Sequence, residues 1–226
     1  MLEREFRISG EAIGSGQDPR LRARPPGRPA LRREGAVRKE PRAAGPAPVY
    51  QLKISLSGSR PPIWRRLLVP GDVTLGRLHD VLQILMGWQD MHLHLFASGR
   101  TVYSPPELDI GVPSRNERKV QLREVLLREK ERLRYEYDFG DGWEHVIVVE
   151  KILLPGTGGD RPVCLAGKRS GPPEDSGGIL GYERLLAILR DPADPEHQEL
   201  AAWVPKDFDP EAFDLEAINR ALAQLR

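Results

Sequence analysis

The chain has 226 residues, 30% of them charged, and a formal net charge of +1, a length that allows one large domain or two small ones. It holds no apolar run approaching the roughly 18–20 residues that a membrane span needs, so we expect no membrane contact and a cytoplasmic location. The single cysteine, Cys164, excludes an intrachain disulfide and a multi-cysteine zinc site. We expect it to be a buried hydrophobic residue in a reducing compartment.

The first 48 residues differ in composition from the rest. They hold 11 Lys and Arg against 6 Asp and Glu, with seven Pro and six Gly, whereas residues 49–226 are net acidic. Such a segment cannot bury enough apolar surface to offset its ordering entropy, so we predict a disordered basic tail over 1–48 and one domain over 49–226. The tail could contact nucleic acid weakly, could have no function, or could precede the true translation start.

From Val49 onward, the hydrophobic residues indicate hairpins and helices in turn. Period-two alternation predicts strands over residues 50–56 and 63–69, joined by a Gly- and Pro-containing turn. Thr74 stands at an N-cap position before a helical apolar stripe that ends at Gly87. A second hairpin follows over 91–98 and 101–103, then a loop over 104–118 and a short helix over 120–126.

A third hairpin is the clearest. Alternating residues over 133–139 and 143–153 flank a tight Gly-Asp-Gly turn. Residues 155–178, with seven Gly and four Pro, are expected to be irregular, and three helices over 180–190, 195–204 and 215–225 close the chain. We therefore predict an α+β fold with a mainly antiparallel (mixed) sheet built from hairpins, covered by helices, and with a helical C-terminal part.

Several segments together resemble the plasmid pRiA4b ORF-3-like family, bacterial and archaeal domains of unsettled function. The segments are residues 63–66 (IWRR), 78–79 (LH), 87–88 (GW), 92–96 (HLHLF), 135–145 (YEYDFGDGWEH), 172–178 (PPEDSGG), 181–182 (GY), Trp203 and 208–210 (FDP). The resemblance implies a domain of this family over 49–226 and little about its activity. Members have been labelled as transposon passengers or resolvase-like, but this chain shows no clear serine-recombinase pattern.

Four of the five histidines lie in these segments, which raises the question of a metal site. His92 and His94, two apart on a predicted strand, are expected to point the same way and could share a divalent ion at about 2.0–2.1 Å. His79 and His145 are further candidate ligands. Carboxylates that could complete the set are Asp138, Asp141, Glu174 and Asp175. The alternative is that these histidines are packed, hydrogen-bonded core residues.

Two acidic loops are candidates for binding a ligand or a partner. The first holds Asp138, Asp141 and Trp143, and the second holds Glu174 and Asp175 before two glycines. In the first loop, turn chemistry alone explains the Asp and Gly residues. In the second, Asp175 or Ser176 could instead cap the following helix.

These observations favour a non-catalytic binding or interaction module, of mobile-element or regulatory origin, for an unknown protein or small-molecule ligand and with no established cofactor. The alternative is a metal-dependent hydrolase or nuclease in which His79, His92, His94 or His145 bind the ion and Asp141 or Glu174 is the general base. A third hypothesis is DNA binding through the basic tail.

Overall fold

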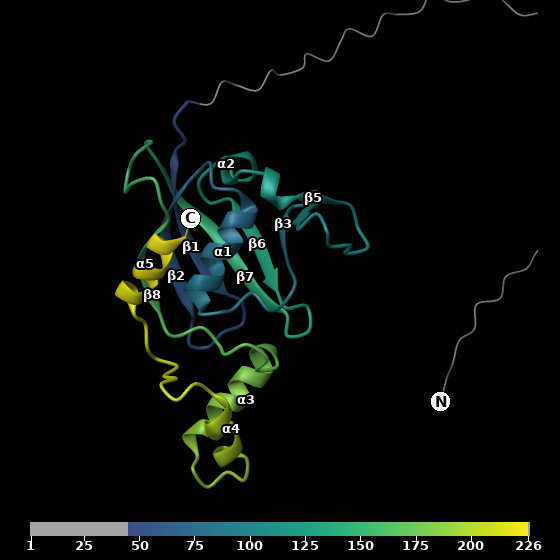
Figure 1. Ribbon diagram of the computed structural model, residues 1–226, viewed down its shortest axis with the longest axis vertical. Coiled ribbons are helices and arrows are strands. Elements are labelled where there is room, and N and C mark those ends of the chain that lie inside the picture. The colour runs from purple at the N-terminus through teal and green to yellow at the C-terminus, as the bar shows by residue number, and fades with distance from the viewer. Residues whose placement is uncertain (1–44, 226) are drawn as a thin grey trace, which may run out of the picture. The chain divides into compact units, whose positions relative to one another are not determined.

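The computed structural model describes residues 45–225, and its centre is one eight-stranded sheet (Figure 1). The strand order is β5-β4-β3-β6-β7-β1-β2-β8, and every neighbouring pair is antiparallel except the parallel pair β4 and β5. The strands are β1 (Val49–Leu56), β2 (Trp64–Pro70), β3 (His94–Ser98), β4 (Thr101–Ser104), β5 (Ser114–Asn116), β6 (Arg132–Tyr137), β7 (Trp143–Leu153) and β8 (Val163–Lys168). The predicted α+β class is confirmed.

The helices differ in where they lie relative to the sheet. They are α1 (Leu75–Met86), α2 (Leu122–Val125), α3 (Gly178–Arg190), α4 (His197–Trp203) and α5 (Leu215–Gln224), with a 3₁₀ turn η1 (Glu117–Lys119). Figure 1 shows α1 lying across the sheet and α3 and α4 forming a separate pair beyond one end of it. The predicted caps of α1 are present, since Thr74 Oγ1 accepts from the Arg77 N–H at 3.2 Å and Gly87 is left-handed with φ 77°.

The core lies between α1 and one face of the sheet. Alternate residues of the strands, such as Leu52, Ile54 and Leu67, have no exposed surface, and the apolar stripe of α1 is equally buried. Period-two strands and a period-3.6 helix each present one apolar face, and burying these faces together drives the assembly.

Several elements differ from the prediction, and one of them, β5, lies in the stretch 104–118 that was expected to be loop and pairs there with β4. Strand β3 begins at His94 and not at residue 91, because Met91 and Leu93 are 72% and 54% exposed and the chain before them turns through Asp90, whose φ is 57°. Strand β6 ends at Tyr137, which leaves Phe139 41% exposed. Strand β8 lies within the stretch expected to be irregular, where it pairs with β2 at the edge of the sheet.

The predicted tail and its boundary stay predictions. Residues 1–44 lie outside the described part of the chain, and β1 begins at Val49. Within residues 45–225, no helix combines the length and the apolar character needed to cross a membrane.

Candidate functional site

A cleft of about 590 Å³ opens where β3 begins, beside the turn between β6 and β7. Its wall brings together Asp90, His92, His94 and Asp138. These residues belong to two histidine–carboxylate clusters. We call His92, Asp138 and Asp175 the rim cluster, and His79, Asp90 and His94, with Glu117 and Tyr135, the inner cluster.

The rim cluster places three ligand-type atoms around one point. His92 Nε2 lies 3.1 Å from Asp175 Oδ1 and 3.7 Å from Asp138 Oδ2, and the three atoms lie within 4.8 Å of one another. His92 Nε2 is shielded from solvent and has no hydrogen-bond partner within residues 45–225. It lies close to the two carboxylates, but the geometry does not align a hydrogen bond to either of them. A buried nitrogen without a partner, facing two carboxylates, is an arrangement that an ion would satisfy.

The backbone of the rim cluster is fixed in an uncommon conformation. Asp138 and Asp175 have φ values of 56° and 59°, in the left-handed region that non-glycine residues visit rarely and that Asp and Asn tolerate best. Asp138 Oδ1 accepts from the N–H groups of Gly140 and Asp141 at 2.9 and 3.3 Å, which orients the carboxylate and leaves Oδ2 toward His92. The turn chemistry predicted for this loop therefore also directs one oxygen at the cluster.

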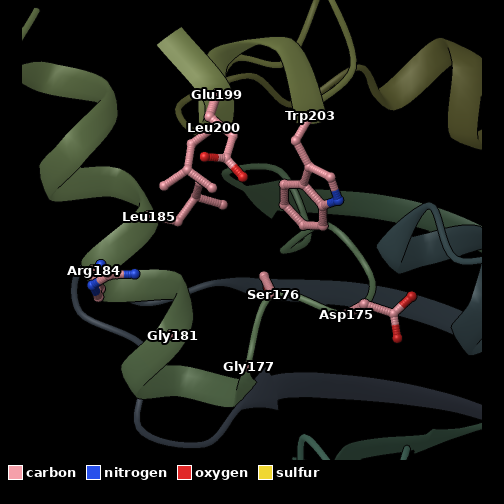
Figure 2. A pocket seen from close by; sticks show the side chains of 9 residues that line it. All are labelled: Asp175, Ser176, Gly177, Gly181, Arg184, Leu185, Glu199, Leu200 and Trp203. Atoms are coloured by element: carbon pink, nitrogen blue, oxygen red, sulfur yellow. The ribbon is translucent and has the colours of Figure 1, made fainter. Parts of the chain in front are cut away.

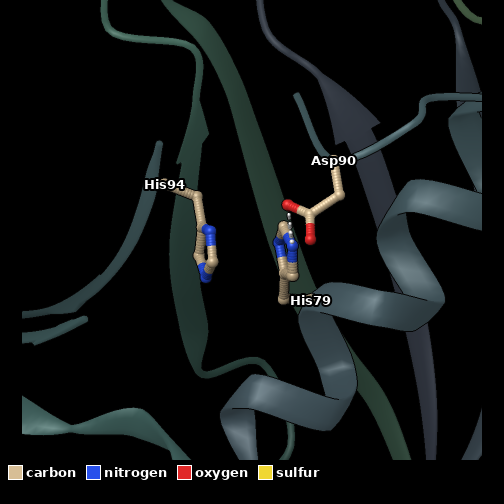
Figure 3. Close-up of side chains that lie close together, drawn as sticks. All are labelled: His79, Asp90 and His94. Atoms are coloured by element: carbon tan, nitrogen blue, oxygen red, sulfur yellow. Dashed lines mark hydrogen bonds and ion pairs between the residues drawn. The ribbon is translucent and has the colours of Figure 1, made fainter. Parts of the chain in front are cut away.

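The inner cluster is a hydrogen-bond network, and Figure 3 shows the part of it formed by His79, Asp90 and His94. His79 Nε2 donates to Asp90 Oδ1 at 2.9 Å, and its Nδ1 accepts from the Tyr135 hydroxyl at 2.8 Å, which in turn accepts from Gln83 Nε2 at 3.0 Å. His94 Nε2 donates to both oxygens of Glu117 at 3.1 Å. Because each of these buried polar groups has a partner, the network stabilises the packing of α1 on β3 and β6.

Ring geometry in the inner cluster opposes a shared ion. The imidazoles of His79 and His94 stack with centroids 3.5 Å apart and planes 6° from parallel, as Figure 3 shows. An imidazole binds a metal through a lone pair in its own plane, and two parallel planes have no point in common. Burial lowers the pKa of His79, and the neighbouring His94 lowers it further, so the stack holds a neutral His79.

The predicted face shared by His92 and His94 is not formed. His92 precedes β3 and joins the rim cluster, whereas His94 is the first residue of β3 and joins the inner cluster. The reason is the late start of the strand, since strand alternation cannot orient a residue that lies before it.

His145 lies apart from both clusters. It is fully buried in β7, with its ring 5.4 Å from that of Trp88 and 5.6 Å from that of Tyr135. Burial lowers the pKa of His145 to about 3, and the charge of Arg65 acts in the same direction. The backbone of Trp143 acts in the opposite direction and raises the pKa of His145, although neither ring nitrogen of His145 has an aligned hydrogen bond within residues 45–225. His145 is therefore a neutral core residue in this structure.

Among the remaining predicted site residues, Asp141 and Glu174 connect the acidic loops to each other and to neighbouring segments. Asp141 Oδ2 accepts from the Gly177 N–H at 3.0 Å, and Glu174 accepts from the Gln89 N–H at 3.0 Å and from the Tyr137 hydroxyl. Burial, and secondarily this bond to Glu174, raises the pKa of Tyr137. Trp143 is fully buried.

Gly178 shows how closely these loops approach each other. It has φ 67°, and a Cβ atom there would lie 2.3 Å from the Asp141 carbonyl oxygen. Only glycine therefore fits where the loop before α3 meets the turn between β6 and β7.

The two carboxylates of the inner cluster were not among the predicted ligands. Asp90 follows the turn at Gly87, and Glu117 lies in a charged stretch that was expected to be loop. Glu117 is 2% exposed, and no local pattern distinguishes it from its exposed neighbours Arg118 and Lys119. Its burial follows from packing against α1.

The comparisons with known proteins agree with these motifs. The family model of the plasmid pRiA4b ORF-3-like protein matches residues 48–217. The chain belongs to the plasmid pRiA4b ORF-3-like family. The uncharacterised protein y4hQ of Sinorhizobium fredii (strain NBRC 101917 / NGR234) is 36% identical over 181 residues, which are 79% of this chain and 93% of that protein.

A solved structure is also similar to this chain. The crystal structure of MM3350 from Methanosarcina mazei Go1, a protein of unknown function, is similar to this chain with a TM-score of 0.69 and 39% identity. The match covers 76% of this chain and 97% of that one. The family model confirms the predicted family. The names of the two relatives describe no activity.

Proposed function

We propose that this protein is a binding module that holds one divalent metal ion at the rim cluster. The open coordination positions of that ion would face a ligand in the cleft. The carrying observation is the spacing of three atoms, His92 Nε2, Asp138 Oδ2 and Asp175 Oδ1, in a cluster where His92 Nε2 has no aligned hydrogen bond within the described chain.

The spacing fits a small ion. Two ligand atoms bound to a tetrahedral ion at about 2.1 Å lie about 3.4 Å apart. The distances from His92 Nε2 to the two carboxylates, 3.1 and 3.7 Å, lie on either side of that value. One imidazole and two carboxylates suit zinc, manganese or iron(II), and three protein ligands leave at least one position for another molecule.

Binding is favoured over hydrolysis by the state of the predicted general bases. Glu174 already accepts two hydrogen bonds, and Asp141 accepts one from the Gly177 N–H. A carboxylate that caps backbone groups is stabilised as an acceptor and is less free to take a proton from water. Hydrolysis therefore stands second to binding among the proposals.

Apolar side chains beside the rim cluster support a ligand with an apolar part. Met91, Leu93 and Phe139 are exposed large hydrophobic residues, and all three line the same cleft. A group of exposed apolar side chains next to a few polar groups is typical of a binding cleft.

The test is calorimetric titration of the full chain, stripped with a chelator, with Zn²⁺ and separately with Mn²⁺. We expect one ion per chain for at least one metal, and a loss of affinity of tenfold or more in His92→Ala. The matched control is His197→Ala, because His197 lies at the start of α4 and in neither cluster. Absence of stoichiometric binding, or equal binding by His92→Ala and the parent chain, would overturn the proposal.

The location and the tail contact also belong to the proposal. A cytoplasmic protein is consistent with Cys164, which is a buried free thiol. The weak nucleic-acid contact predicted for residues 1–48 falls almost entirely outside the described residues, and DNA retention at low salt with and without the tail would test it.

A further inference from the structure

A second pocket, of about 440 Å³, lies between α3 and α4 on the helical pair beyond the sheet (Figure 2). Its apolar wall is formed by Leu185, Leu200 and Trp203, and its polar groups include Asp175, Arg184 and Glu199. Figure 2 shows the indole of Trp203 reaching from α4 between the carboxylates of Glu199 and Asp175. None of these residues lines the cleft described above, and only Asp175 belongs to the rim cluster.

The charge of this pocket is negative. Arg184 is neutralised by Glu196, whose two oxygens both lie 2.6 Å from Arg184 Nη2. Glu199 is exposed and has no ion pair among residues 45–225, and Asp175 contacts only the partly buried His92 there. Glu199 therefore faces the pocket without a countercharge, and Asp175 does so as well when no ion is bound at the rim cluster.

The aromatic wall is also available. Trp203 is 45% exposed although it is a large aromatic residue, and α4 contributes no buried residue to the core. An exposed indole beside a pocket offers its π face to a cation, and partly exposed Trp residues dominate many binding surfaces.

We infer that this pocket binds a guanidinium group, such as an arginine side chain. A guanidinium is planar, stacks on an indole, and donates paired hydrogen bonds to a carboxylate, so it matches Trp203 together with Glu199 or Asp175. An uncharged apolar ligand would remove water from the carboxylates without replacing their hydrogen bonds, which is unfavourable. The alkyl part of an arginine would lie against Leu185 and Leu200.

The test is a titration with N-acetyl-arginine amide, followed by NMR of the indole N–H signals and by calorimetry. We expect saturable binding that shifts the signal of Trp203, assigned with Trp203→Phe. N-acetyl-citrulline amide, which has nearly the same shape and no charge, should bind at least tenfold more weakly. Equal binding of the two compounds would overturn the inference.

Variants locate the binding. Trp203→Ala and Glu199→Gln should each weaken arginine binding at least fivefold, whereas Glu183→Gln should leave it unchanged, because Glu183 is an exposed residue of α3 outside the pocket. Both targets are exposed, so unfolding midpoints should stay close to that of the parent chain. Arginine binding that survives both substitutions would contradict the assignment.

Two further experiments distinguish a peptide ligand from a free amino acid and distinguish this pocket from the rim cluster. Tighter binding of a Gly-Arg-Gly peptide than of free arginine supports the arginine of a partner polypeptide, and the reverse supports the free amino acid. His92→Ala should weaken metal binding at least tenfold and keep arginine binding, whereas Glu199→Gln should keep metal binding and weaken arginine binding at least fivefold. The two proposals can therefore fail separately.

Discussion

The inner and rim clusters contain the same kinds of residue and lie on the same cleft, yet they differ in what their polar atoms contact. In the inner cluster, His79 uses both ring nitrogens, and His94 is held by both oxygens of Glu117. In the rim cluster, His92 Nε2 has two carboxylates near it and no aligned hydrogen bond from the described residues. Two clusters of similar composition therefore differ in how far the hydrogen bonds of their histidines are satisfied.

Burial follows the same division for the histidines and not for every carboxylate. His79, His94 and Glu117 are 4%, 6% and 2% exposed, whereas the side chains of His92 and Asp175 are 27% and 70% exposed. The side chain of Asp90 in the inner cluster is 60% exposed, and that of Asp138 in the rim cluster is 11% exposed. A buried and satisfied network contributes to folding, and removing one member leaves the others unpaired. A histidine that is more exposed and has no aligned hydrogen bond contributes less to folding. The comparison therefore predicts opposite phenotypes for neighbouring substitutions.

The largest expected effect is on folding, in His94→Ala. Removing the imidazole leaves the buried Glu117 carboxylate without its partner, which destabilises a protein by about 3–5 kcal/mol. Urea unfolding of the variant and of the parent chain measures the difference. His92→Ala is the matched control, with an expected change within about 0.5 kcal/mol. Equal losses in the two variants would remove the distinction between the clusters.

A second effect appears on acidification and comes from His145. The pKa of His145 in the folded chain is about 3, which is below the ordinary value for histidine. Between these two pH values, the unfolded chain binds a proton at His145 and the folded chain does not. The stability that comes from keeping His145 neutral is fully present above about pH 6.5 and is lost as the pH falls toward 3. The loss is about 1.4 kcal/mol per pH unit. His79, whose pKa is also lowered, acts in the same direction.

The measurement is the free energy of unfolding between pH 7 and pH 5, which spans part of this range. His145→Leu should reduce the slope by close to one proton, because leucine removes the titrating group and fills an apolar site. His197→Ala, outside the core, should keep the slope of the parent chain. An unchanged slope in His145→Leu would show that His145 does not resist protonation.

A smaller effect is expected for Tyr135→Phe. The substitution removes the hydroxyl that donates to His79 Nδ1 and accepts from Gln83 Nε2, leaving two buried polar groups unpaired. We expect a loss of about 1–3 kcal/mol in the free energy of unfolding, with metal binding at the rim cluster unchanged. A weaker metal affinity in this variant would show that the two clusters are coupled.

The smallest effect on stability is expected for Asp175→Asn. Asparagine tolerates the left-handed backbone of this position, and the side chain is 70% exposed, so the free energy of unfolding should change by less than about 0.5 kcal/mol. The same substitution should weaken metal binding at least tenfold. Asp160→Asn, at another exposed aspartate, is the control for charge alone.

Much of the fold could be predicted because the local sequence of the central strands shows clear alternation of apolar and polar residues. Strands β1, β2, β6 and β7 follow clear alternation, and α1 has both caps in its sequence. Strand β8 could not be predicted, since it depends on distant partners. It pairs with β2, and Asn219 of α5 bonds to both the N–H and the carbonyl of Cys164 at 2.8 and 2.9 Å.

The site was predictable as a set of residues but not as a grouping. The motifs supplied His79, His92, His94, Asp138 and Asp175, which the structure brings to one end of the sheet. The division into two clusters depends on where β3 begins and on a turn at Asp90, and both are tertiary features. Glu117 is buried by its contact with α1, which no local pattern records.

The most direct test of the metal proposal is a crystal structure of the full chain grown with Zn²⁺, with diffraction recorded on both sides of the zinc absorption edge. We predict an anomalous peak about 2.0–2.2 Å from His92 Nε2 and within bonding distance of Asp138 and Asp175. A peak between His79 and His94, or none at the rim cluster, would contradict it.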